Sequence, residues 1–129
     1  MSKQKIQILN KDFTIHRLKP NDNLPKESIQ SKYSWIGKTE EELSVVCESG
    51  IKLPSQKSDN NWTAIKVVGP FAFTEVGILA DISRILAEAE ISIFALSTFD
   101  TDYILIKKER IEDAAAALQK EGYVIERQE

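Results

Sequence analysis

Residues 78–107 read ILADISRILAEAEISIFALSTFDTDYILIK, and two periodicities follow one another within them. In the first part, apolar residues recur at the spacing of one helix face, with charged residues on the opposite face: Ile78, Ile82, Ile85, Leu86 and Ala89. In the second part, apolar runs at 91–98 and 103–107 flank residues 99–102, which contain the short polar residues of a turn, as is typical of a β-hairpin. The stretch therefore predicts a helix followed by two antiparallel strands.

The residues on either side extend this order. Residues 62–68 are rich in β-branched side chains and predict a strand before the helix, whose N-terminus Thr74 could cap. Downstream, residues 111–118 return to helical spacing, and Gly122 provides a stop before a short strand at 123–125. The order is β-α-β-β-α-β, so we predict an α+β chain whose C-terminal half has a ferredoxin-like fold.

The N-terminal half predicts a smaller, β-rich unit. Its expected strands are 6–9, 13–18, 33–37 and 43–47, with one or two helical turns within 24–30 and a polar linker at 50–61. The acidic turn 38–42 between two apolar strands also resembles the turn 97–102 of the second half. The first half is thus expected to be a shortened copy of the second.

The hairpin strands are apolar on both faces. Ile93 and Ala95 lie on one face of the predicted sheet, whereas Phe94 and Leu96 lie on the other. A sheet covered by helices on one side only would alternate apolar and polar residues. We therefore expect the second face to be covered too, either by the N-terminal unit or by a second chain.

The composition narrows the class of protein. The 129 residues carry 17 Lys and Arg against 20 Asp and Glu, a net charge of −3, without a basic block of the kind that nucleic acids bind. No apolar run has the length of a membrane span, and the basic N-terminus lacks the apolar region of a signal peptide. Because Cys47 is the only cysteine, an intrachain disulfide is excluded. We expect a cytoplasmic globular protein with neither a nucleic acid nor a membrane as its partner.

Residues 74–82, TEVGILADI, followed by 89–93, AEISI, resemble an ACT domain, a ferredoxin-like regulatory module that binds amino acids at interfaces between paired domains. The usual loop of that family has Asp and Pro where this sequence has Thr74 and Val76, while Gly77 is kept. Residues 42–47, 69–73 and 93–105 resemble a small bacterial branch with two ACT-like units, related to the animal cytosolic arginine sensor.

The resemblance implies a division and a function. We expect a shortened ACT-like unit with its linker at 1–60 and an ACT domain at 61–129. The implied protein is non-catalytic and regulatory, forms a homodimer and binds a small ligand, an amino acid, between ACT-like units. The alternative is a ligand-free dimerisation or docking module whose pocket has degenerated.

Two segments supply the candidate ligand-binding residues. Around the helix start, free N–H groups attract carboxylates and Gly77 leaves the first turn open, unless this glycine only permits close helix–sheet packing. In the hairpin, the Asp100 carboxylate could pair with an α-ammonium group, whereas Asp102 is expected to be structural. The predicted set is Phe73, Thr74, Glu75, Val76, Gly77, Ile78, Ser97, Thr98, Phe99 and Asp100, with Ser44 contributed by the first unit.

Catalytic signatures are missing from the sequence. The lone His16 and the apolar surroundings of Cys47 indicate structural roles. Without a phosphate loop, a metal-ligand cluster or a Ser/His/Asp pattern, we expect no catalytic residue, metal or cofactor. Two ferredoxin-like alternatives rank last, an RNA binder that would need exposed aromatic pairs and a small hydrolase that would need Arg17 before a helix.

Overall fold

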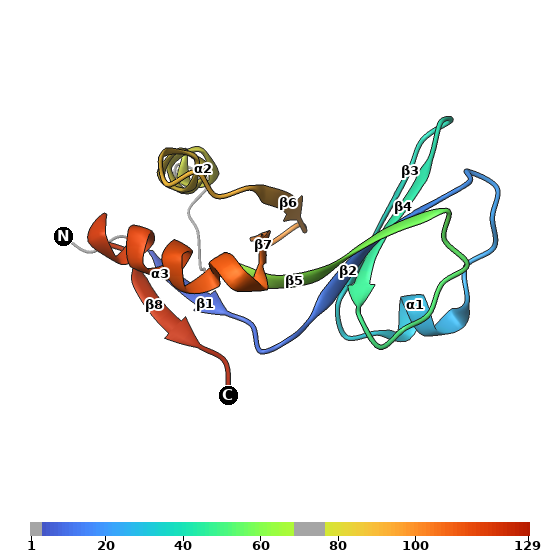
Figure 1. Cartoon of the computed structure of the whole chain (residues 1–129), viewed down its shortest axis with the longest axis horizontal. Coiled ribbons are helices and arrows are strands. Elements are labelled where there is room, and N and C mark those ends of the chain that lie inside the picture. The colour runs from blue at the N-terminus through green and yellow to red at the C-terminus, as the bar shows by residue number, and fades with distance from the viewer. Residues whose placement is uncertain (1–3, 69–76) are drawn as a thin grey trace. The chain divides into compact units, whose positions relative to one another are not determined.

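The computed structural model describes residues 4–68 and 77–129. The chain forms two compact units (Figure 1). Unit 1 combines Met1–Asn10 with Thr63–Glu129, and unit 2 is Lys11–Trp62. Each unit has its own strands and apolar core.

Unit 1 contains most of the regular structure. Its elements are β1 (Lys5–Ile8), the second half of β5 (Lys57–Val68), α2 (Ile78–Glu88), β6 (Ile93–Ser97), β7 (Asp102–Lys107), the 3₁₀ turn η1 (Lys108–Arg110), α3 (Ile111–Lys120) and β8 (Val124–Arg127). Neighbouring strands in its sheet follow the order β6-β7-β5-β1-β8. The predicted helix, hairpin, second helix and last strand are all present, so the ferredoxin-like order is confirmed.

One strand of this sheet comes from the start of the chain. β1 was expected in the N-terminal unit, but it pairs antiparallel with β5 and parallel with β8. Ile6 and Ile8 are buried and belong to the core formed with the helices. The burial of these two side chains on the helix-covered face stabilises β1 between β5 and β8, which are distant from it in the sequence.

The core of unit 1 lies between the sheet and the two helices. α2 contributes Ile82, Ile85 and Leu86, while α3 contributes Ala114, Ala115 and Leu118. α3 ends as predicted, because Gly122 has a φ of 101° that suits the left-handed turn after a helix. The opposite face is also buried at β7, where Leu105 is 0% exposed and Tyr103 is 9% exposed, in agreement with the two-sided apolar pattern.

Unit 2 is a smaller β-rich unit. It contains β2 (Phe13–Leu18), the short helix α1 (Lys26–Gln30), β3 (Ser34–Lys38), β4 (Leu43–Glu48) and the first half of β5. These strands follow the order β3-β4-β2-β5. Its core groups Leu18, Leu43, Val45 and Cys47 with the partly buried residues Leu24, Ile51 and Leu53.

The predicted linker is wrong in its last part. Residues 57–61 are not irregular but form the first half of β5, which pairs with β2 across a register shift between Phe13 and Ile15. These polar residues are exposed, so their side chains gave no apolar alternation to detect. The backbone hydrogen bonds to β2 stabilise the strand instead, and Asn61 has the positive φ of 66° that Asn tolerates at such an irregularity.

Candidate functional site

The β6–β7 hairpin carries four of the predicted ligand-binding residues. β6 and β7 pair antiparallel from Ile93↔Ile106 to Ser97↔Asp102, and the Thr98 N–H closes the turn by donating to the Thr101 carbonyl at 2.9 Å. The Ser97 hydroxyl donates a 2.6 Å hydrogen bond to Asp102 Oδ1. Asp102, the first residue of β7, therefore has the structural role that was predicted, because its carboxylate bonds Ser97 across the hairpin beside the turn.

Thr101, which was not among the predicted ligand-binding residues, connects this hairpin to β5 of unit 1. Thr101 is partly buried, and its hydroxyl donates a hydrogen bond to the carbonyl of Val67, near the end of β5. β7 also pairs with β5 in the sheet. The hairpin turn thus lies beside the point where β5 leads into residues 69–76. The sequence signal for this contact was the Thr between two Asp residues, because a hydroxyl in a turn commonly bonds to the backbone.

The tip of the hairpin faces solvent. Phe99 is 99% exposed, and Asp100 is exposed as well. Within the described residues, the Asp100 carboxylate makes no hydrogen bond or ion pair, in contrast to that of Asp102. Of the two hairpin carboxylates, that of Asp100 is the one without a partner among the described residues.

The start of α2 is formed by Gly77 in the left-handed conformation, with φ 79° and ψ 7°. A Cβ added to this glycine would have no heavy atom within 4 Å. Close helix–sheet packing is therefore not the reason for a glycine here; the backbone conformation is. The next residue, Ile78, is partly buried against the core of unit 1.

Four of the predicted residues, Phe73, Thr74, Glu75 and Val76, lie outside the described residues. The prediction that Thr74 caps the helix is not supported at the helix start itself: Gly77 occupies the N-cap position of α2, without a side-chain cap. The first turn holds Asp81, and its carboxylate is engaged by Arg84 at 3.0 Å and by Tyr123 at 2.6 Å.

Ser44 lies in the other unit. Its hydroxyl donates a 2.8 Å hydrogen bond to Glu42 Oε1, and Glu42 also binds Arg17 at 2.6 Å. Like Ser97, Ser44 therefore already serves a neighbouring carboxylate. A role for Ser44 as a ligand contact stays a prediction.

The side chains of His16 and Cys47 are both buried. Cys47 is 0% exposed and burial raises the pKa of its thiol, which keeps it in the unreactive protonated form. His16 is 6% exposed, burial lowers its pKa, and its Nδ1 lies 3.1 Å from the Ser55 hydroxyl. Across 4–68 and 77–129, no three His, Cys, Asp or Glu side chains are grouped so as to hold a metal ion. The described helices are all too short or too polar to cross a membrane.

A family model described as an ACT domain matches residues 57–120, from the first residue of β5 to the last of α3. This part of the chain belongs to the ACT domain family. A second family model, described as an N-terminal domain, matches residues 11–54, most of unit 2. The ACT domain match therefore falls on the helices, the hairpin and β5, and the strands β1 and β8 lie outside it.

A curated relative of this ACT protein is the human cytosolic arginine sensor for mTORC1 subunit 1. The two sequences are 34% identical over 86 residues, which cover 60% of this chain and 26% of the sensor. The bovine sensor matches with the same identity and coverage. The match thus spans about a quarter of the length of these curated relatives.

Two solved structures share the fold over all or most of this chain. An Agobacterium tumefaciens protein solved by a structural genomics consortium is 32% identical with a TM-score of 0.91, and the match covers 100% of this chain and 96% of that one. The ligand-free regulatory subunit of aspartate kinase from Thermus thermophilus, 10% identical, has a TM-score of 0.63 over 89% of this chain and 95% of its own. This second likeness concerns the fold alone.

Proposed function

We propose that this ACT protein is a non-catalytic regulatory protein of the cytoplasm that binds an amino acid. Family membership and the similarity to a protein named as an arginine sensor support a sensing role. In the proposal the protein acts as a homodimer, and the ligand lies at an interface between ACT-like units.

The observation that carries the proposal is the contrast between the two carboxylates of the hairpin. Asp102 is held by Ser97, whereas Asp100 is exposed and unengaged among the described residues. The α-ammonium of an amino acid, or a cationic side chain, is the partner that such a carboxylate suits. Gly77 begins α2 in the same unit, and the first backbone N–H groups of a helix suit a ligand carboxylate.

The occupied hydroxyls favour the alternative function, a ligand-free association module. Ser97 donates to Asp102 and Ser44 donates to Glu42, so the proton of each hydroxyl is already used in a hydrogen bond within the protein. In this alternative the ACT fold serves only to join chains, and Asp100 is an ordinary solvated turn residue.

Thermal unfolding across the proteinogenic amino acids distinguishes the two functions. A ligand that binds only the folded protein stabilises it by about 2.7 kcal/mol at roughly one hundred times Kd. We expect one amino acid, with arginine among the first probes, to raise the unfolding midpoint, and Asp100→Ala to abolish that rise without lowering the midpoint of the free protein.

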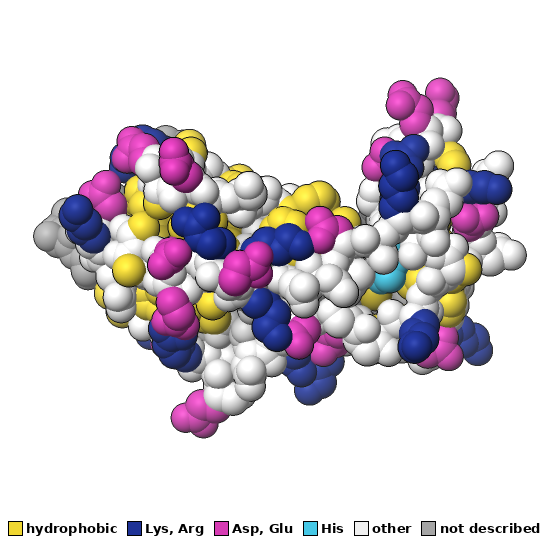
Figure 2. Space-filling view, in the orientation of Figure 1, with side chains coloured by type: hydrophobic (Ala, Val, Ile, Leu, Met, Phe, Trp, Pro, Cys, Tyr) yellow, Lys and Arg dark blue, Asp and Glu magenta, His cyan; other side chains and the backbone are white. Residues whose placement is uncertain are grey.

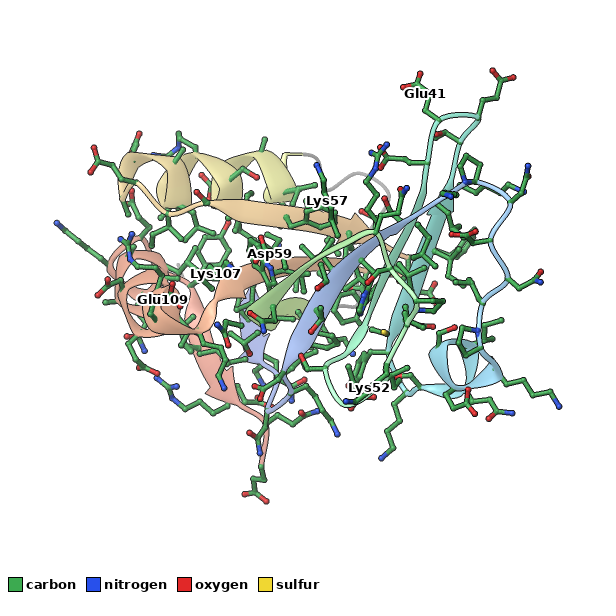
Figure 3. The ribbon with its side chains drawn as sticks, turned by 45° about the vertical axis from the view of Figure 1, so that its right-hand side comes forward. Glu41, Lys52, Lys57, Asp59, Lys107 and Glu109 are labelled. Atoms are coloured by element: carbon green, nitrogen blue, oxygen red, sulfur yellow. The ribbon has the colours of Figure 1, made fainter. Side chains whose placement is uncertain are left out.

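Glu41→Ala provides the matched control, because Glu41 is an exposed acidic residue at the tip of the hairpin in unit 2 (Figure 3). Its response to the ligand should equal that of the unsubstituted protein. A flat response of the unsubstituted protein to every amino acid would reject the sensing role in favour of the association module. An equal response in Asp100→Ala would remove Asp100 from the site.

A further inference from the structure

β3 is the terminal strand of its sheet and leaves one edge open. Among the described residues its only strand neighbour is β4. Ile36 on this strand is 45% exposed, and Gly37 and Lys38 are exposed as well. An edge strand with an exposed apolar residue can accept another strand through its unpaired backbone groups.

The register identifies which backbone groups are unpaired. Thr39 N–H donates to the Glu42 carbonyl at 2.9 Å, in the same register that pairs Gly37 with Ser44 and Trp35 with Val46. Hydrogen-bonded and non-hydrogen-bonded pairs alternate along an antiparallel ladder. The N–H and C=O groups of Ser34, Ile36 and Lys38 therefore point away from β4.

The side chain of Ile36 extends an existing core. Ile36 lies opposite Val45, which is 0% exposed and belongs to the apolar core of unit 2. Residues directly opposite in neighbouring strands lie on the same face of the sheet. A further strand beside β3 would therefore continue this core past Ile36.

We propose that the further strand is β3 of a second copy of this chain, paired antiparallel with Ile36 on the two-fold axis. In this register Ile36 lies opposite Ile36 of the second copy, and Ser34 lies opposite Lys38. All the outward backbone groups of the strand then find partners, and the two exposed isoleucines cover each other.

The charges beside the strand are complementary in this register. Lys32 precedes β3 and Glu40 follows it, and both are exposed (Figure 2 shows acidic side chains gathered at the outer end of this hairpin). Antiparallel pairing about Ile36 brings Lys32 of each copy opposite Glu40 of the other. Moving the axis to Trp35 would instead place Lys32 opposite Lys38, a like-charge pair that is unfavourable.

β6, the terminal strand beside β7, is less suitable for self-pairing. Its turn also closes with a hydrogen-bonded pair, Thr98 and Thr101, so Ala95 is the central outward residue. Pairing about Ala95 would bring Glu90 of each copy opposite Asp100 of the other, which joins two negative charges. The charges therefore favour β3 as the strand that joins two copies.

This interface rests on the homodimer of the proposed function but not on its ligand, so the two can fail separately. The experiment is sedimentation equilibrium of the full chain over a wide concentration range, without any amino acid. We expect a monomer–dimer equilibrium in which Ile36→Pro, which removes an outward N–H, is monomeric at concentrations that make the unsubstituted protein a dimer. The N–H of Ile36 is not bonded to β4, so the fold should persist; the check is an equal thermal midpoint at a low concentration where both proteins are monomeric.

Charge reversals supply a test that Ile36→Pro cannot. Lys32→Glu alone and Glu40→Lys alone should each weaken the dimer about tenfold, because two symmetric attractions become repulsions. An equimolar mixture of these two variants should regain the original affinity as a heterodimer. Ile29→Lys, at an exposed residue on α1 of the same unit, is the control and should leave the dimer unchanged.

Two outcomes would overturn the interface. One is a chain that stays monomeric at every concentration; the other is a dimer that tolerates Ile36→Pro and both charge reversals. Neither outcome bears on the thermal shift produced by an amino acid, which is measured on the same protein and tests ligand binding independently.

Discussion

The Tyr123 hydroxyl donates a 2.6 Å hydrogen bond to Asp81 Oδ2 and so connects the residue before β8 to the first turn of α2. Arg84 bonds the other oxygen of the same carboxylate at 3.0 Å. Tyr123 is 4% exposed and packs in the core of unit 1. Its hydroxyl thus finds a charged acceptor at the margin of an apolar region, as buried tyrosines usually do.

Removing this hydroxyl should weaken unit 1 without disturbing its packing. Tyr123→Phe is expected to lower the free energy of unfolding by about 1–2 kcal/mol, because a hydrogen bond to a charged group is lost while the ring stays. Urea unfolding followed by circular dichroism at pH 7 measures the loss. Tyr33→Phe, at a partly buried tyrosine in unit 2, is a comparison that should leave the hydrogen bond to Asp81 intact.

The Tyr123 hydroxyl should also make the stability of the folded protein fall at alkaline pH. Burial and the Asp81 carboxylate raise the pKa of Tyr123, so the folded state keeps a proton that the unfolded chain releases near pH 10. Stability from this group is complete below pH 10 and is lost as the pH rises further. Tyr123→Phe should therefore show a smaller decline above pH 10, and an identical decline in both proteins would contradict the assignment.

His16 should make unit 2 sensitive to mild acid. Burial lowers the pKa of His16 below 6.5, so the folded state favours the neutral ring and the unfolded chain binds the proton first. The contribution is fully present above pH 6.5 and is lost as the pH falls through the lower folded pKa. Urea unfolding between pH 7.5 and pH 5 should show this decline in the unsubstituted protein and less of it in His16→Leu.

A glycine should be required at position 77 because of the backbone conformation there, and not because a larger side chain would clash. Gly77→Ala is expected to cost about 1 kcal/mol, because an alanine at φ 79° is strained even though its Cβ meets nothing within 4 Å. Gly50 offers a matched control, since its Cβ position is equally open and its φ is not positive. Gly50→Ala should be neutral in thermal unfolding, and equal effects of the two substitutions would refute the conformational explanation.

The two hairpin carboxylates should differ in their contribution to the stability of the free protein. Asp102→Ala removes the acceptor of the Ser97 hydroxyl and is expected to cost about 1 kcal/mol of stability. Asp100→Ala should cost nothing in the free protein, because that carboxylate has no partner among the described residues. Denaturant unfolding of the two variants side by side measures the difference.

Elements with local patterns were predictable from the sequence. The apolar stripe of α2 and the hairpin of β6 and β7 depend on residues close together in the chain, and both form where the periodicity placed them. Gly122 likewise ends α3, since a glycine in the left-handed region after a helix is a local signal.

Features that depend on distant partners were not predictable. Nothing in residues 57–61 indicates a strand, because their side chains are polar and exposed and the stabilising hydrogen bonds come from β2. The position of β1 depends on β5 and β8, which lie far along the chain, since Ile8 pairs with Ile65 and with Arg127. The hydroxyl of Ser97 suited a ligand as well as it suited Asp102, and only the geometry distinguishes the two partners.

The placement of β1 has a consequence for dividing the chain. Unit 1 is assembled from Met1–Asn10 and Thr63–Glu129, and the whole of unit 2 is inserted between those segments. A fragment starting near residue 61 would lack the strand that separates β5 from β8, and with it Ile6 and Ile8 of the core. The ACT unit is therefore not separable by trimming the N-terminus. It would have to be excised as a circular permutant, or with residues 4–10 joined to 63–129 by a short designed loop.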